Sequence, residues 1–270
     1  MTQDDIYDSD EQRALLRRGR ALFDILGQDP RYTYYGRTVG LATGAVRDLD
    51  HLTALARVQG NAAIALVPEA EVAALHDGLT ARNLVPIAYS RWDGGSASLA
   101  AAKAIVRDLP LPAGLTMTRI DADTPSMVLA SLADMALGCG VLPLAGEVLR
   151  GLLNPAVCLV AQDGEGKVVS CGASAGFAHP DHPALGRQQA YWGMLATDTA
   201  WRGRKLAFIL GAHAMLSMSR DHGIEAFFTG VEPGNTPSEG VCTRLMLARS
   251  VAVILGCADP RSLRSGRMTK

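Results

Sequence analysis

The sequence predicts an α/β (α+β) fold in which helices and strands alternate along two unequal parts of the chain. Short apolar runs of strand length recur between longer stretches with helical spacing. Prolines stand in the first turn of several of those longer stretches, where a helix tolerates them. Residues 107–116 contain two prolines and a glycine, so we expect domains at 1–112 and 113–270.

The first part is predicted to be a small α/β unit. Residues 11–27 have the spacing of an amphipathic helix. The following elements are a strand at 62–67, a helix at 68–83 that begins with a proline, and a strand at 84–90.

The second part contains a longer series of predicted elements. Helices are expected at 124–137, 143–152, 203–221 and 236–247, and strands at 115–121, 156–162, 168–177, 190–198, 225–231 and 250–255. The turn sequence DGEGK joins two of these strands into a hairpin. Gly223 supplies the stop signal for the long helix before it.

Composition narrows the function classes. The chain has 270 residues, 48% hydrophobic and 20% charged, with a net charge of −1. This balance provides no basic field for nucleic acid or an anionic membrane, so we expect neither partner. Five cysteines without a C-x-x-C pair predict reduced thiols and no metal site. We expect a cytoplasmic protein, because the sequence shows no secretory signal and no membrane-spanning apolar run.

The start of the predicted helix at 203–221 is unusual, because three cations precede a run that is apolar on almost every side. Arg202, Arg204 and Lys205 stand directly after a strand. A helix N-terminus carries unpaired amides and partial positive charge, so cations there favour a bound anion such as a phosphate. A solvated helix start is the alternative interpretation.

The segment LATDTAWRGRKLA resembles the pyrophosphate loop of the GNAT superfamily of N-acyltransferases, Arg/Gln-x-x-Gly-x-Gly/Ala. Arg202 fills the first position and Ala207 the last, whereas Lys205 stands where the family usually has glycine. The resemblance implies a mixed, mostly antiparallel sheet flanked by helices, with acetyl-CoA as co-substrate. The positions it implies for coenzyme A binding are Arg202, Gly203, Arg204, Lys205, Leu206 and Ala207 for the pyrophosphate, and Leu195, Ala196 and Thr197 for the pantetheine arm.

A second segment, VEPGNTPSEGVCTRLML, resembles the next strand-loop-helix unit of the same superfamily. Asn235 and Ser238 match its Asn-x-x-Ser/Ala spacing, and the resemblance implies that they also contact coenzyme A. Cys242 occupies the position of the family's tyrosine. Asn235 is alternatively a helix cap, and Cys242 a small buried packing residue. The first part carries no motif of the superfamily and is either a diverged copy of the same fold or a lid over the acceptor site.

Acyl transfer to an amine requires a group that takes up the amine proton and one that supplies a proton to the departing thiolate. Glu232 is our candidate base and Cys242 our candidate proton donor. Four further residues stay open as bases: Asp198, His179, Asp181 and His182. The two histidines and the aspartate of HPDH lack a fourth ligand, so we interpret them as a polar loop.

The sequence therefore predicts an acetyl-CoA-dependent N-acetyltransferase acting on a small-molecule or peptide amine. A coenzyme A-binding sensor or scaffold without catalysis is the alternative. A nucleotide-binding α/β protein is disfavoured because no Gly-x-Gly-x-x-Gly or P-loop follows a strand. The sequence leaves the acceptor and a possible homodimer open.

Overall fold

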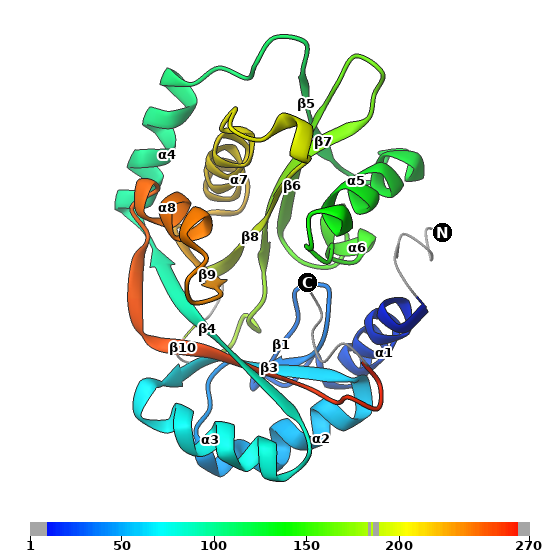
Figure 1. Ribbon diagram of the computed structural model, residues 1–270, viewed down its shortest axis with the longest axis vertical. Helices are drawn as coiled ribbons and strands as arrows, with labels where there is room; N and C mark the ends of the chain where they lie inside the picture. Colours follow the sequence, from blue (N-terminus) through cyan, green and yellow to red (C-terminus); the bar gives the residue numbers. More distant parts are fainter. Residues whose placement is uncertain (1–9, 183–184, 186–188, 264–270) are drawn as a thin grey trace.

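The last strand of the chain lies between two strands from its first third. The computed structural model describes residues 10–182, 185 and 189–263 (Figure 1). The strands of the described residues form one ten-stranded sheet in the order β1-β2-β3-β10-β4-β9-β8-β7-β6-β5. The strand bounds are β1 Tyr32–Thr33, β2 Gly40–Leu41, β3 Asn61–Pro68, β4 Val85–Gly94, β5 Thr116–Ile120, β6 Ala156–Gln162, β7 Val168–Gly176, β8 Gln189–Thr197, β9 Ala226–Val231 and β10 Ala248–Ala258.

Helices cover this sheet on both sides. Their bounds are α1 Asp10–Leu26, α2 Leu49–Gln59, α3 Glu69–Ala81, α4 Ser96–Asp108, α5 Ser126–Gly138, α6 Gly146–Leu149, α7 Leu206–His222 and α8 Thr236–Arg244, with 3₁₀ turns η1 Val46–Asp48 and η2 Thr199–Trp201. The structure adds α2 and α4, which the sequence pattern did not predict. α4 is rich in alanine, whereas α2 carries leucines among polar residues.

The sheet is mostly antiparallel, and only β2/β3 and β8/β9 pair in parallel. The predicted mixed, mostly antiparallel sheet flanked by helices is therefore confirmed. The division at residue 112 stays a prediction, and it falls between α4 and β5. The sheet itself crosses that point, because β10 pairs antiparallel with both β3 and β4.

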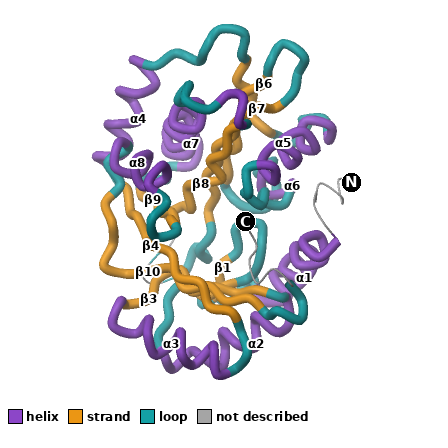
Figure 2. The backbone as a smooth tube through the Cα atoms, viewed as in Figure 1, coloured by secondary structure: helices purple, strands orange, loops and turns teal. Residues whose placement is uncertain are grey.

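The alternation of side chains along β6 shows how both faces of the sheet are covered. Val157 and Leu159 pack in one cluster with α4 and α7, whereas Cys158 and Val160 pack in another with α5. Successive residues of a strand point to opposite faces, so α7 and α5 lie on opposite sides of these strands. Figure 2 shows the same separation, and α2 and α3 lie together against β3, β4 and β10.

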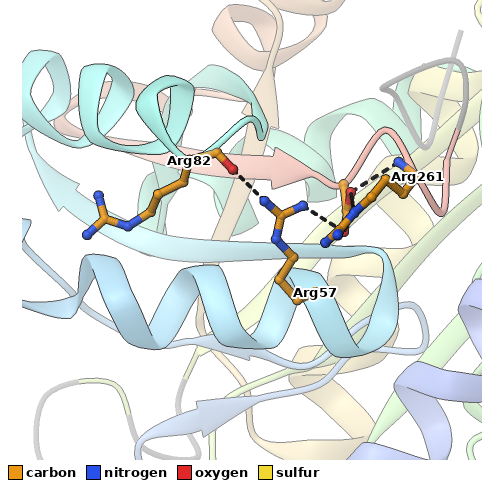
Figure 3. A network of polar contacts seen from close by, with 4 residues as sticks. Arg57, Arg82 and Arg261 are labelled. Carbon is orange, nitrogen blue, oxygen red and sulfur yellow. Dashed lines mark hydrogen bonds and ion pairs between the residues drawn. The ribbon is translucent and has the colours of Figure 1, made fainter.

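A buried carboxylate fixes the end of β10. Asp259 follows the strand directly, and its side chain is 2% exposed. It pairs with Arg57 of α2 at 2.9 Å and with Arg261 at 2.9 Å (Figure 3). Arg57 also donates a hydrogen bond to the Arg82 carbonyl after α3. The network joins the end of the last strand to two helices of the first part.

Within the described part of the chain, the structure contains no helix long and apolar enough to cross a membrane.

Candidate active site

Strands β8 and β9 separate within the sheet. They pair in parallel at only three positions, the last of which joins Tyr191 to Phe228. Past that pair β8 bulges, because residues 193–196 lie opposite only residues 171–173 of β7. Met194 within the bulge has φ of 51°, a left-handed conformation that residues with a side chain rarely adopt. Beyond the last pair, β8 therefore leaves backbone groups without a partner strand on the β9 side.

A cavity of about 470 Å³ lies at this separation. The residues around it come from β8, β9, α7 and α8, and also from β1 to β4 and β10. On the side of the separated strands they include Gly193, Met194, Leu195, Ala207, Glu232, Asn235, Ser238, Val241 and Cys242. On the side of the first part they include Thr33, Tyr35, Arg37, Thr38, Asn61, Ala63, Ala65 and Tyr89.

Aromatic rings connect these two sides. Tyr35 stacks on Tyr191 with ring centroids 4.8 Å apart, and Tyr191 meets Phe228 edge-on at 5.9 Å. Tyr191 folds back over its own strand, since a Cβ added at Gly193 would lie 2.4 Å from the Tyr191 hydroxyl. A residue without a side chain at position 193 is thus what lets this phenol lie in the cavity wall.

The predicted pyrophosphate loop lies at the outer end of the same strand. Arg202, Arg204 and Lys205 are exposed, and none of them pairs with an acidic group of any described residue. Arg204 stacks over Trp201 at 4.5 Å. At the loop-helix junction the Arg202 amide donates to the Thr199 carbonyl at 3.4 Å, and the Ile209 amide donates to the Lys205 carbonyl at 3.0 Å. The amides of residues 203–208, between these two, have no backbone acceptor among the described residues, as an anion-binding helix start requires.

Helix α7 begins at Leu206 and not at residue 203, because two residues ahead of it have positive φ. Gly203 has φ of 79° and Lys205 has φ of 61°. Glycine adopts a left-handed conformation without strain, whereas Lys205 adopts it here while adding a cation. Leu206 itself is buried, and Ala207 lines the cavity.

The three strand positions predicted to contact the pantetheine arm, Leu195, Ala196 and Thr197, have different surroundings. Leu195 lines the cavity. The Ala196 carbonyl accepts a hydrogen bond from Ser170 at 2.8 Å, and the Thr197 carbonyl accepts from Cys139 Sγ at 3.2 Å and from Arg202 Nε at 3.3 Å. Of the three residues, Leu195 is therefore the one placed at the cavity, whereas the carbonyls of Ala196 and Thr197 bond within the protein.

The second predicted segment forms the opposite wall of the cavity. Asn235 caps α8, and its side-chain oxygen accepts from the Ser238 amide at 3.2 Å. The structure thus realises the cap, and both residues also line the cavity. Glu232 lies exposed at the end of β9 and reaches the same cavity. Cys242 is 2% exposed, and burial raises the pKa of its thiol to about 12.

The other candidate bases lie elsewhere. Asp198 caps η2 through the Ala200 amide and pairs with Lys167 at 3.6 Å. His179 and His182 accept hydrogen bonds from the amides of Asp181 and Leu185 within their own loop. None of these four candidates lines the cavity. Across the described residues no three His, Cys, Asp or Glu side chains gather as a metal site.

The sequence interpretation missed the contribution of the first part. The segment YTYYGR brings Thr33, Tyr35 and Arg37 to the cavity, and β3 and β4 bring Asn61 and Tyr89. These residues carry no motif spacing. The one signal is their composition, a dense group of tyrosines beside an arginine.

Solved structures with the same fold were found by comparison of the folded chain. A GCN5-related N-acetyltransferase from Kribbella flavida superposes with a TM-score of 0.58 at 14% identity, covering 94% of this chain and 98% of that one. A GCN5-related N-acetyltransferase-like protein from Streptococcus suis gives 0.52 at 17% identity, with 85% and 84% covered. A tandem GNAT protein from the clavulanic acid biosynthesis pathway gives 0.51 at 14% identity, with 79% and 67% covered. By sequence, the chain matches no protein-family model, and no curated protein matches it significantly.

Proposed function

We propose that this chain, which has the fold of the GCN5-related N-acetyltransferases, transfers an acetyl group from acetyl-CoA to an amine. One observation carries the proposal: the cavity at the separated strands β8 and β9 lies on the strand that leads into the exposed, cation-bearing start of α7. This arrangement has room for a long thioester with its diphosphate outside and its acyl group inside.

The residues fit acetyl-CoA at both ends. The amides of residues 203–208, together with the side chains of Arg202 and Lys205, offer donors and positive charge to a diphosphate. Leu195, Ala207 and Val241 supply an apolar lining for the thioester arm. Acetyl-CoA supplies an activated acyl group, and the protein has to position the amine and manage its proton.

The reaction balances with few groups. The amine nitrogen forms a bond to the acetyl carbon, the carbon–sulfur bond breaks, and the products are an amide and the free thiol of coenzyme A. Glu232 at the cavity takes the amine proton, directly or through water. The thiolate takes a proton from solvent or from Cys242. The buried Cys242 thiol is a reluctant donor, because its pKa is raised to about 12.

Calorimetry tests the binding step. Replacement of the cations in the variant Arg202→Ala/Lys205→Ala is expected to weaken acetyl-CoA binding about tenfold or more, since charge-assisted contacts contribute about 1.5–3 kcal/mol. Arg220→Ala is the matched control, because Arg220 is an exposed arginine at the other end of α7. Equal affinity in all three proteins would overturn the loop assignment.

Release of free thiol with a panel of amines tests the chemistry. Turnover that depends on both acetyl-CoA and an amine is expected, and Glu232→Gln should lower kcat more than it changes KM. Binding without turnover on any amine would instead support the coenzyme A sensor.

A further inference from the structure

A buried positive charge lies in the wall of the cavity without a negative partner. Arg37, in the segment between β1 and β2, is 8% exposed and lines the cavity. Its guanidinium donates to the Leu142 carbonyl, and its Nε is buried with no acceptor. No carboxylate of any described residue pairs with it. Its side chain also hydrogen-bonds with Tyr35. A guanidinium has five N–H groups, and here the Nε hydrogen is left without an acceptor.

Two other buried arginines, Arg91 and Arg150, show how a buried guanidinium is provided with hydrogen-bond acceptors in this protein. Arg91 pairs with Asp93 at 2.9 Å and also donates to the Ala65 carbonyl and Gln189. Arg150 donates to three backbone carbonyls near the start of α5, at 2.6 to 3.2 Å. Neither lines the cavity. Arg37 differs from both in its position and in its unpaired nitrogen.

The neighbours of Arg37 in the wall do not neutralise it. Burial raises the pKa of Tyr35 to about 12, so this phenol is uncharged at neutral pH. Asn61 is 4% exposed, and its side-chain oxygen is a second buried polar atom without a partner. Two residues of the cavity wall thus each hold one buried polar atom without a partner, which is costly to leave unmatched.

The charges of the cavity are few. Among the described residues that line it, Arg37 is the one basic side chain and Glu232 the one acidic side chain. Arg37 belongs to the wall from the first part, whereas Glu232 lies beside the separated strands. A ligand with an amine at one end and a single anionic group at the other matches this distribution. A dianionic phosphate is served less well, since no second cation among the described residues lines the cavity.

We propose that the acceptor is a small amine carrying a carboxylate, as an amino acid does, with the carboxylate bound by Arg37 and the amine directed to Glu232. This inference rests on the proposed acetyl transfer and specifies its substrate class. Arg37 acts as a specificity residue and takes no part in bond making.

Paired acceptors test the proposal on the unaltered protein. Thiol release is measured with glycine and glycinamide, with β-alanine and its amide, and with other amino acids and their amides. Rates are compared per neutral amine, because the amide compounds are less basic. A kcat/KM preference for the acids of about ten- to a hundredfold is expected, which is the range of a charge-assisted hydrogen bond. O-phosphoethanolamine is included, and its preference over the amino acids would overturn the carboxylate assignment.

Variants then test whether Arg37 causes the preference for the acids over the amides. Arg37→Met should lower kcat/KM for the acids to the level of the amides and leave the amides unchanged, and Arg37→Lys should keep part of the preference. Arg31→Met is the control, because Arg31 lies directly before β1 but is exposed and paired with Asp29. If the role of Arg37 were purely structural, Arg37→Met would lower kcat/KM for the acids and the amides alike. That result would overturn the inference while leaving the proposed acetyl transfer intact.

The two proposals fail in different ways. If no amine reacts, the proposed function fails, and ligand-detected NMR then compares binding of the acids and amides to the full chain. Selective binding of the acids that Arg37→Met abolishes would still support the carboxylate site. Equal binding of both, or binding of neither, would overturn it.

Discussion

The ring of Tyr35 lies stacked on the ring of Tyr191, with centroids 4.8 Å apart and 22° between the ring planes. Tyr35 comes from the first part of the chain and Tyr191 from β8, at the position where β8 parts from β9. The contact makes one continuous wall from two distant segments. It places the cavity wall from the first part of the chain beside the separated strands.

Gly193→Ala is expected to displace Tyr191 from the cavity wall. The added methyl carbon would lie 2.4 Å from the Tyr191 hydroxyl, closer than any real contact. We expect a loss of about 1–3 kcal/mol in the free energy of unfolding, together with lower acetyl transfer. Urea denaturation and thiol release measure the two effects. Gly164→Ala is the control, since its Cβ would meet nothing within 4 Å, and equal behaviour of the two variants would refute the prediction.

Gly211→Ala tests how α7 seats on the sheet. The new Cβ would lie 2.7 Å from the Trp192 ring, whose Nε1 donates to the Gly211 carbonyl at 2.9 Å. Overpacking at this buried crossing should lower stability by about 1–3 kcal/mol. Gly240→Ala in α8 meets nothing within 4 Å and should instead raise stability slightly, because alanine favours a helix by about 1 kcal/mol over glycine. Thermal denaturation measures both changes: the melting temperature should fall in Gly211→Ala and rise in Gly240→Ala.

Lys205→Gly should separate stability from binding. Lys205 has φ of 61°, and glycine removes the strain that a side chain incurs there. We expect a gain of about 0.5–1 kcal/mol in the free energy of unfolding, reduced by the extra chain freedom of glycine, together with weaker acetyl-CoA binding. Lys205→Ala should weaken binding without the gain in stability. A stability loss in the glycine variant would contradict this account of the loop.

Asp259→Asn should loosen the end of β10. The variant removes a buried carboxylate from Arg57 and Arg261, and we expect a loss of about 2 kcal/mol at pH 7. Hydrogen bonds from Arg261 hold the Asp259 pKa well below its usual range. Its contribution is thus present above the unfolded pKa of about 4 and is lost as the pH falls below that value.

Urea denaturation across this pH range measures the effect. The difference between wild type and Asp259→Asn should shrink on acidification. Asp50→Asn, which breaks the exposed pair with Arg82, serves as the control and should have little effect at any pH. A difference that does not change with pH would show that the charge of Asp259 is not what stabilises this end.

Cys242→Ala is expected to lower kcat by less than tenfold. The thiol is buried and its pKa is raised to about 12, so it stays protonated across the working range and donates reluctantly. The pH profile of kcat should keep its shape in the variant. A much larger loss, in a protein with wild-type melting temperature, would show that Cys242 supplies the proton to the departing thiolate.

Local patterns of the sequence were enough to predict much of the fold. The mixed, mostly antiparallel sheet, which the resemblance to the GNAT superfamily implied, is confirmed. The hairpin of β6 and β7 and the long apolar α7 with its stop at Gly223 are confirmed as well. Each depends on neighbours in sequence: alternation in strands, helical spacing, and glycine at a left-handed cap. Helices α2 and α4 were not predicted, although each has apolar residues at helical spacing.

The candidate site likewise has one part that the sequence could predict and one part that it could not. The loop at Arg202 and the cap at Asn235 could be predicted because helix starts expose amides within a few residues of one another. The place of β10 between β3 and β4, the buried charge of Arg37 and the stack of Tyr35 on Tyr191 could not. These depend on strand pairing and side-chain packing between segments far apart in sequence, which leave no local period, and only the tertiary structure decides them.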